Sequence, residues 1–185
     1  TGMEQTPDAL NTLNNWGAVE VASGRPDVAE PLFREAVDLR RRYYGPSAAT
    51  AALLSNHGKL LLMTGQPDQA LPVLREAAAM GAQFAGHGSL HHVAALSGQS
   101  EAELALTRTL DAERSAEAAL SAALEKLGRD HPGTAMASLA MAAVRGEQAR
   151  PGDAQALLVE AERIAAAVGP PGARIGAQAA VLRDR

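Results

Sequence analysis

Three histidines lie close together near the middle of the chain, in Gly86-His87-Gly88-Ser89-Leu90-His91-His92. Imidazole nitrogens bind zinc, and two histidines four residues apart on one helix form a common ligand pair. Ser89, however, has the properties of a helix N-cap, so His87 is expected to precede the helix that carries His91 and His92. No cysteine or carboxylate follows at ligand spacing. We therefore predict surface or loop histidines, with no metal site and no cofactor.

Other sequence patterns of catalysis are also missing. The chain has no cysteine, which removes disulfides and thiolate nucleophiles. Its 17 glycines occur one at a time at turns, and no phosphate-binding loop, nucleophile elbow or pair of carboxylates stands out. We therefore predict no catalytic residues and no enzyme. An enzyme or metal protein centred on the three histidines is the least favoured of the function classes that we consider.

The charged residues narrow the choice of partners. They make up 21% of the 185 residues and give a net charge of −4, with both signs spread evenly along the chain. Nucleic acid is therefore not expected as a partner. No apolar run approaches the roughly 20 residues of a membrane-spanning helix, so we expect no membrane partner. The lack of cysteine fits a reducing compartment, and we expect a cytoplasmic protein.

Composition also predicts the fold class. The chain has 41 alanines but only five aromatic residues, and valine and isoleucine are scarce. Alanine and leucine favour helices, whereas strands need β-branched and aromatic side chains. The sequence therefore predicts an all-α protein. Its content of alanine, glycine and arginine also suggests a GC-rich bacterial source.

A repeat is the strongest signal in the sequence. The segment from Gly24 to Ala36 returns further along the chain as Gly65 to Ala77. A looser copy begins at Ala116, and another copy lies at Arg150-Pro151-Gly152-Asp153-Ala154. The copies follow one another at a spacing of about 42 residues, so the sequence predicts four repeat units in phase.

Each unit is predicted to form two helices joined by a short turn. In the first unit Thr6 is the N-cap with Pro7 after it, Gly24 ends the first helix, and the second helix runs from Pro26 to Gly45. The other predicted helices span about 47–64, 67–83, 89–109, 112–127, 132–146 and 151–168, with a short closing helix over 171–183.

Small residues recur where paired helices must approach closely. They are Gly17, Gly58 and Ala142 in the first helices, and Ala29, Ala70, Ala116 and Ala154 in the second. The third unit lacks a glycine at the first of these positions and also lacks the Gly-Arg turn. We therefore expect a kinked or lengthened helix around 97–100. His57 shares a core position with Trp16 and Met141, so we expect it to be partly buried and hydrogen-bonded.

The whole pattern resembles tetratricopeptide repeats, in particular the long-linker kinesin light chain type found in bacterial proteins. The resemblance is carried by Leu13-Asn14-Asn15-Trp16-Gly17, Gly24-Arg25, Ala29-Glu30-Pro31-Leu32-Phe33-Arg34-Glu35-Ala36 and Leu127-Gly128-Arg129-Asp130-His131-Pro132. It implies a right-handed superhelix of about four antiparallel helix pairs plus a short C-terminal helix. The chain is then a single repeat domain over 1–185, with repeats at about 8–46, 47–87, 88–130 and 131–169 and a cap at 170–185.

Asparagines in the first repeat are candidates for binding. Asparagine is a mediocre helix former, so three of them within one predicted helix need an explanation. In the resembling family the first helix of each pair lines a concave groove, where asparagines bind the backbone of an extended peptide. The resemblance therefore implies a groove lined by Asn11, Asn14, Asn15, Ser55, Asn56 and Lys59. The other interpretation is that these side chains satisfy neighbouring helix ends or face water.

Two function classes follow from the resemblance and the repeat. The favoured one is a non-catalytic module that binds a peptide or protein segment in its groove. A place as the regulatory part of a larger bacterial signalling protein is compatible with this class. The alternative is a self-associating scaffold without a separate peptide ligand, so the sequence leaves a homo-oligomer open. Apolar surfaces at the ends of the array would favour this second class.

Overall fold

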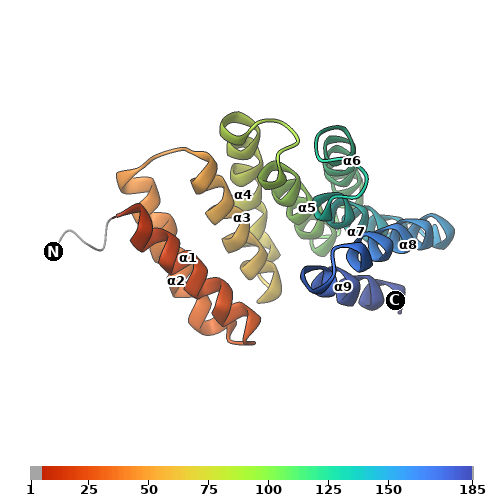
Figure 1. Ribbon diagram of the computed structural model, residues 1–185, viewed down its shortest axis with the longest axis horizontal. Coiled ribbons are helices and arrows are strands. Elements are labelled where there is room, and N and C mark those ends of the chain that lie inside the picture. The colour runs from red at the N-terminus through yellow and green to blue at the C-terminus, as the bar shows by residue number, and fades with distance from the viewer. Residues whose placement is uncertain (1–5, 185) are drawn as a thin grey trace.

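The protein is all-α in the computed structural model, which describes residues 6–184. Within that range lie nine α-helices, and no strand is present among them (Figure 1). The helices are α1 (Pro7–Ala22), α2 (Pro26–Tyr43), α3 (Ala48–Met63), α4 (Pro67–Met80), α5 (Leu90–Ala105), α6 (Thr109–Lys126), α7 (Pro132–Glu147), α8 (Pro151–Ala167) and α9 (Ala173–Arg183). The all-α prediction is confirmed.

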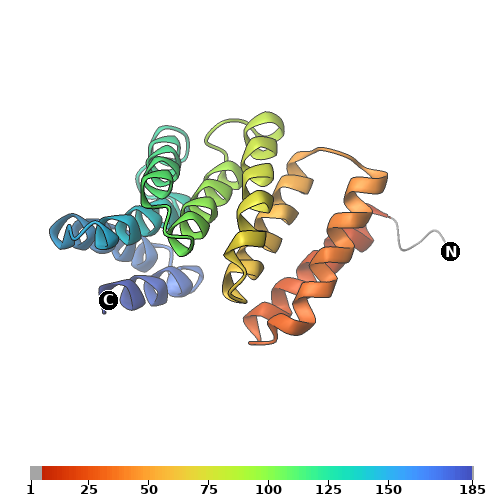
Figure 2. The same cartoon turned by 180° about the vertical axis from the view of Figure 1, so that it is seen from behind.

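The first eight helices form four antiparallel pairs that stack in sequence order. Figures 1 and 2 show the pairs following one another from α1 and α2 at one end to α7 and α8 near the other. Each helix contacts the next along the chain, and α9 packs on α8 and α7 as the predicted closing helix. Apolar clusters fill the spaces within and between the pairs, as expected for a solenoid of helical repeats.

The same turn joins the two helices of every pair. One residue in each turn has a left-handed backbone: Gly24 (φ 73°), Gly65 (φ 72°), Thr107 (φ 59°) and Ala149 (φ 55°). These positions recur with the period of the repeat. The third pair therefore follows the same rule as the others, and the expectation that it lacks this turn is wrong. The turn was missed because Thr107 stands where the first two turns have glycine.

The third pair is regular in its helices as well. The structure shows no kink at 97–100, because α5 runs unbroken from Leu90 to Ala105. Ser100 takes the small position of this pair, and its Oγ donates a 2.8 Å hydrogen bond to the Ala112 carbonyl of α6. Ala112, rather than the expected Ala116, is the counterpart of Ala70, although both alanines are buried. The irregular segment lies one helix earlier, at the π-helical turn Gly81–Ala85.

Glycine is required at the small positions of the first two pairs. A Cβ atom on Gly17 would lie 2.8 Å from the Phe33 ring, and one on Gly58 would lie 2.5 Å from Leu74 Cγ. Both distances are shorter than any tolerated contact, so a side chain there would force the helices of the pair apart. The small-residue prediction is therefore confirmed at these positions.

The shared position of Trp16, His57 and Met141 differs between the pairs. Met141 is buried as predicted, but Trp16 is 51% exposed because no helix pair lies in front of α1 in the described chain. His57 stacks on Phe33 with ring centroids 6.5 Å apart. Neither of its ring nitrogens has a hydrogen-bond partner, so the expected hydrogen bond is absent there. Burial instead lowers the pKa of His57, which favours its neutral form.

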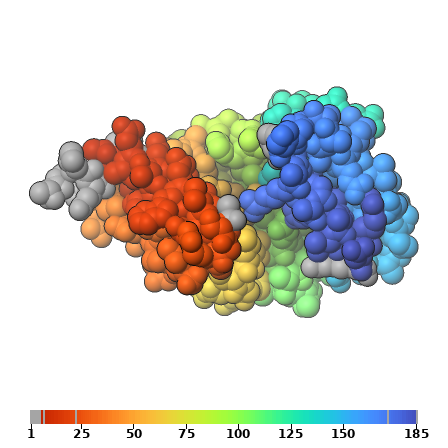
Figure 3. All heavy atoms as spheres, turned by 60° about the horizontal axis from the view of Figure 1, so that its bottom comes forward, coloured from red at the N-terminus to blue at the C-terminus, as the bar shows by residue number. Residues whose placement is uncertain are grey.

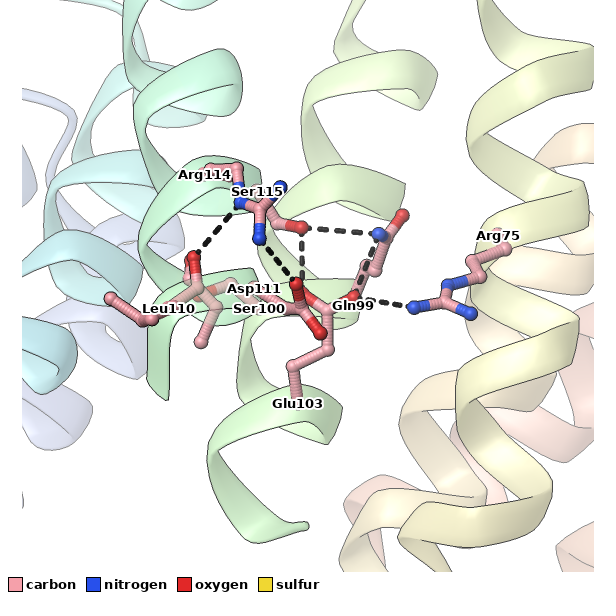
Figure 4. A network of polar contacts seen from close by, with 9 residues as sticks. Arg75, Gln99, Ser100, Glu103, Leu110, Asp111, Arg114 and Ser115 are labelled. Atoms are coloured by element: carbon pink, nitrogen blue, oxygen red, sulfur yellow. Dashed lines mark hydrogen bonds and ion pairs between the residues drawn. The ribbon is translucent and has the colours of Figure 1, made fainter. Parts of the chain in front are cut away.

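A buried carboxylate joins α4, α5 and α6. Glu103 of α5 is 1% exposed, and it accepts hydrogen bonds from Arg75 of α4 (3.0 Å) and Ser115 of α6 (2.7 Å). Gln99 donates to both Glu103 and Ser115, so the four side chains form one network (Figure 4). Burying a charge is costly unless it is paired and hydrogen-bonded. This network meets both conditions and links the second pair to the third.

We expect Thr107→Gly to stabilise the protein by about 0.5–1 kcal/mol, because glycine adopts a left-handed backbone without the Cβ penalty. The matched control is Gly65→Ala, which should cost about 1 kcal/mol through backbone strain alone, since a Cβ there meets no atom within 4 Å. Thermal denaturation of both variants measures the effect. A lower melting temperature for Thr107→Gly would contradict the assignment of this turn.

We expect Arg75→Ala to destabilise the protein by about 1–2 kcal/mol, because it leaves the Glu103 carboxylate buried without its cation. Adding Glu103→Gln to this variant should recover part of the loss by removing the buried charge. Arg114→Ala is the control, because its ion pair with Asp111 is exposed and should contribute less than about 0.5 kcal/mol. Urea denaturation of the four proteins tests the network. Equal effects of Arg75→Ala and Arg114→Ala would show that it contributes nothing.

Candidate functional site

The first helices of the four pairs form one continuous surface. α1 contacts α3, α3 contacts α5, and α5 contacts α7. We call this surface, together with the side of α9 that borders it, the groove. Figure 3 looks toward it and shows a hollow between α1 and α9, with the middle helices at its floor.

The period of the repeat identifies the positions that line the groove. Ala18, Lys59, Glu101 and Ala143 are equivalent residues of α1, α3, α5 and α7. One turn later the equivalent residues of α3, α5 and α7 are Leu62, Leu104 and Gly146. One turn earlier α1 and α3 carry amides. The groove is therefore polar near its amino-terminal end and becomes apolar toward α7 and α9.

A cavity of about 580 Å³ occupies the apolar half of the groove. Five helices contribute to its wall, and most of the lining side chains are apolar and small. The lining residues are Leu62, Glu101, Leu104, Ala105, Leu139, Ala142, Ala143, Gly146, Glu147, Ala149, Ala154, Gln178, Val181 and Leu182. A concave apolar site with a few polar groups is the usual form of a ligand-binding pocket.

Comparison with known proteins agrees with this geometry. Residues 8–83 match the family model of the tetratricopeptide repeat. The chain is built of tetratricopeptide repeats. Among curated protein sequences, none matches it.

Solved structures of tetratricopeptide repeat proteins share the fold. The putative kinesin light chain of Podosopora anserina with nearly identical TPR-like repeats is similar, both as a point variant (TM-score 0.71, 18% identity, 91% of this chain and 80% of that chain) and in a second crystal structure (TM-score 0.66, 17% identity, 90% and 79%). BtubC (BKLC) from P. vanneervenii is also similar, with a TM-score of 0.71 and 17% identity over 87% of this chain and 65% of that chain. The resemblance to kinesin light chain-type repeats is confirmed at the level of fold.

The matched residues are the first two tetratricopeptide repeats, α1 to α4. The other two pairs repeat the same turn in phase, with Thr107 and Ala149 at the left-handed position. Their departure from the family pattern therefore lies in residue type rather than in backbone geometry. In the described part of the chain, no helix has the length and apolar character needed to cross a membrane.

The structure brings three of the predicted groove residues together. Asn56 of α3 donates a 3.0 Å hydrogen bond to Oδ1 of Asn14 on α1, and Asn14 donates to Oδ1 of Asn15 at 3.4 Å. These amides form a cluster that spans the first two tetratricopeptide repeats. Asn15 is exposed, whereas Asn14 and Asn56 are partly buried. The amide cluster, defined as these three asparagines, thus keeps bonding capacity toward the groove.

The other predicted residues are placed differently. Asn11 accepts a 3.4 Å hydrogen bond from Arg40 of α2, so part of its capacity is used within the first repeat. Ser55 is buried at 4% exposure, which leaves it little access to a ligand. Lys59 is partly buried and lies between the amide cluster and the cavity in the order of the groove positions. The role of all six residues in binding stays a prediction.

Sequence reasoning missed Glu101 and the contribution of α9. Glu101 is the counterpart of Lys59 in the next repeat, and the error in the register of the third repeat concealed it. Gln178 and Val181 of α9 line the cavity, but nothing in the repeat pattern places α9, because it lies beyond the last pair. One repeat period counted from Lys59 and from Leu62 would have identified Glu101 and Leu104.

Lys59 and Glu101 are opposite charges in the partly buried centre of the groove. Burial lowers the pKa of Lys59, and the charge of Glu101 opposes this shift. Burial likewise raises the pKa of Glu101, and the nearby Lys59, Gln178 and Arg174 oppose that shift. For both groups the loss of hydration outweighs the attraction, so the groove holds two charges that are poorly solvated. Such groups gain from a ligand that supplies hydrogen bonds.

The three neighbouring histidines do not meet in one place. His92 Nδ1 accepts a 3.0 Å hydrogen bond from the Gly88 backbone, and its ring lies edge-on to His87 at 5.2 Å. His91 is exposed. Within residues 6–184 no group of three or more histidine, cysteine, aspartate or glutamate side chains could hold a metal ion.

We expect Glu101→Gln to raise the melting temperature at pH 7. The folded-state pKa of Glu101 is raised, so the folded protein binds this proton more tightly than the unfolded chain, and stability falls as the pH rises above the ordinary value of 4.5. A neutral amide removes this penalty, and the gain should be about 1–3 °C. The gain should shrink as the pH falls toward 4.5.

The control for this experiment is Glu147→Gln. Glu147 also lines the cavity, but its side chain is exposed, so its neutralisation should leave the melting temperature within about 1 °C. Melting curves from acidic to neutral pH compare the two variants with the wild type. A Glu101→Gln variant that is less stable than the wild type at pH 7 would contradict the burial argument.

Proposed function

We propose that this tetratricopeptide repeat protein is a non-catalytic binding module that holds an extended segment of a partner protein in the groove. Tetratricopeptide repeats are generally protein–protein interaction modules, and this chain offers two complementary features on one surface. The amide cluster supplies donors and acceptors, and the adjoining cavity supplies room for apolar side chains. The juxtaposition of these two features is the observation that carries the proposal.

The amide cluster suits the backbone of a bound segment. An extended peptide must satisfy its backbone groups when it leaves water, because an unpaired buried polar group costs about 1–3 kcal/mol. The backbone groups within α1 and α3 already bond one another, so side chains must supply the partners. An amide side chain has both a donor and an acceptor and can pair with a peptide group whatever the sequence.

The cavity suits apolar side chains of the same segment. Leu104, Leu139 and Val181 provide apolar surface from three different helices, and the alanines between them leave space. Burying one leucine-sized side chain there contributes about 1.5–3 kcal/mol. The Lys59–Glu101 pair lies between the two halves of the groove and would bond polar groups of the segment.

The composition supports a bacterial origin for this module. A module without catalytic residues gains a function from what it is attached to or what it recruits. We propose that it serves as the regulatory part of a larger signalling protein, where occupancy of the groove reports the presence of the partner.

Binding by the groove is tested with a selected ligand and the double variant Asn15→Ala/Asn56→Ala. Short peptides are selected from a random phage-displayed library on the immobilised protein, and their affinity is measured by calorimetry. The double variant should bind them about 5- to 150-fold more weakly, which corresponds to about 1–3 kcal/mol. Its melting temperature should change little, because the gain in helix propensity offsets the lost Asn56–Asn14 bond.

Two further variants complete the experiment. Leu104→Glu places a charge in the cavity and should weaken binding by a similar factor. Gln155→Ala alters an exposed residue of α8 and should leave the affinity unchanged. Peptides that bind the Asn15→Ala/Asn56→Ala and Leu104→Glu variants as tightly as the wild type would overturn the assignment, as would a library that yields no groove-dependent peptide.

A further inference from the structure

A second surface lies at the amino-terminal end of the array, on the side of α1 and α2 that faces away from α3 and α4. Trp16 and Val19 of α1 are 51% and 58% exposed there. We call this side, together with Leu32, Glu35, Leu39 and Arg42 of α2, the end face. It is separate from the groove, so its role is independent of the proposed peptide binding.

The internal repeats show what positions of this kind do. The counterparts of Val19 are Leu60, Ala102 and Val144, and all three are essentially buried between successive pairs. The counterparts of Trp16 include Met141, which is also buried. In α3, His57 of the same set stacks on Phe33 of the preceding pair. The end face therefore carries residue positions that a neighbouring helix pair covers everywhere else in the array.

The second helix of the first pair shows the same pattern. The counterparts of Leu32 and Leu39 are Val73 and Met80, which pack on the core of the preceding pair. Leu32 and Leu39 are only partly buried in the first pair. The counterpart of Glu35 is Glu76, which forms an ion pair with Arg41 of the preceding pair. Glu35 thus stands where a cation from an adjoining layer is expected.

The charges of the end face indicate which partner covers it. Glu35 and Arg42 are two helical turns apart and lie on the same face of α2 with Leu39 between them. Both are exposed, and neither has an ion pair or hydrogen bond with any residue in the described range 6–184. Two opposite charges on either side of an apolar residue are self-complementary about a two-fold axis, because each then meets the opposite charge of an identical helix.

We propose that the end face is the interface of a two-fold symmetric dimer of this chain. α2 of one copy lies antiparallel to α2 of the other, so that Glu35 of each pairs with Arg42 of its partner across the two leucines. Trp16 and Val19 of each copy are then covered by the opposite pair. This places a first helix against a second helix from an adjoining layer, as between the successive pairs of the array.

Charge reversal tests the reciprocal pairs. The dimer is measured by light scattering coupled to size exclusion over a concentration series. Glu35→Arg and Arg42→Glu should each raise the dissociation constant about tenfold or more, because each brings two like charges together twice. The double variant Glu35→Arg/Arg42→Glu should restore the wild-type value. Glu125→Arg, the same change on an exposed part of α6, should have no effect.

The fluorescence of Trp16 gives a second measurement, because it is the only tryptophan in the chain. Its emission should shift to shorter wavelength with dimerisation, and this shift should disappear in Arg42→Glu. Circular dichroism checks that the variants are folded. A protein that stays monomeric throughout would overturn the proposal and would leave a helix pair from a different chain to cover the end face. A dimer indifferent to charge reversal, or a double variant that does not recover, would overturn it equally.

Discussion

The contact between the two helices of each pair fixes where every other helix can lie. Gly17 under Phe33 and Gly58 under Leu74 leave no room for a methyl group. In the third pair the Ser100 hydroxyl bonds the backbone of α6, which again demands close approach. The pairs therefore behave as thin, nearly identical layers, and the first helices of successive layers line up side by side. The groove exists because this spacing is kept through all four layers.

Much of this arrangement could be predicted from the sequence. The all-α class, the four pairs and the turn at Gly24 and Gly65 follow from composition and from one repeated segment. The third layer was harder, because its turn and its small position carry Thr107 and Ser100 instead of glycine. Pattern matching sees residue types, whereas the fold requires only a left-handed backbone and a small side chain at these places. The mistaken kink and the mistaken role of Ala116 both followed from this difference.

The candidate site was predictable only in part. The amides of α1 and α3 stand out, because asparagine is unusual within a helix. The cavity did not, because alanine and leucine line it as they line any helix interface, and only the superhelix shows which of them face the groove. The position of α9 depends on a linker of glycine and proline that carries no repeat signal. Glu101 illustrates the point, since its importance comes from α9 and Lys59 rather than from its own neighbours in the chain.

The hydrogen bonds of the amide cluster run in one sense. Asn56 donates to Asn14, and Asn14 donates to Asn15. Within the described residues, the cluster therefore has a carbonyl oxygen in reserve at its α3 end and an NH₂ group in reserve at its α1 end. A polypeptide laid along the groove also has a sense, since its N–H and C=O groups alternate in a fixed order from one terminus to the other. Such a cluster distinguishes the two orientations in which one segment can lie, a form of selectivity that requires no recognition of side chains.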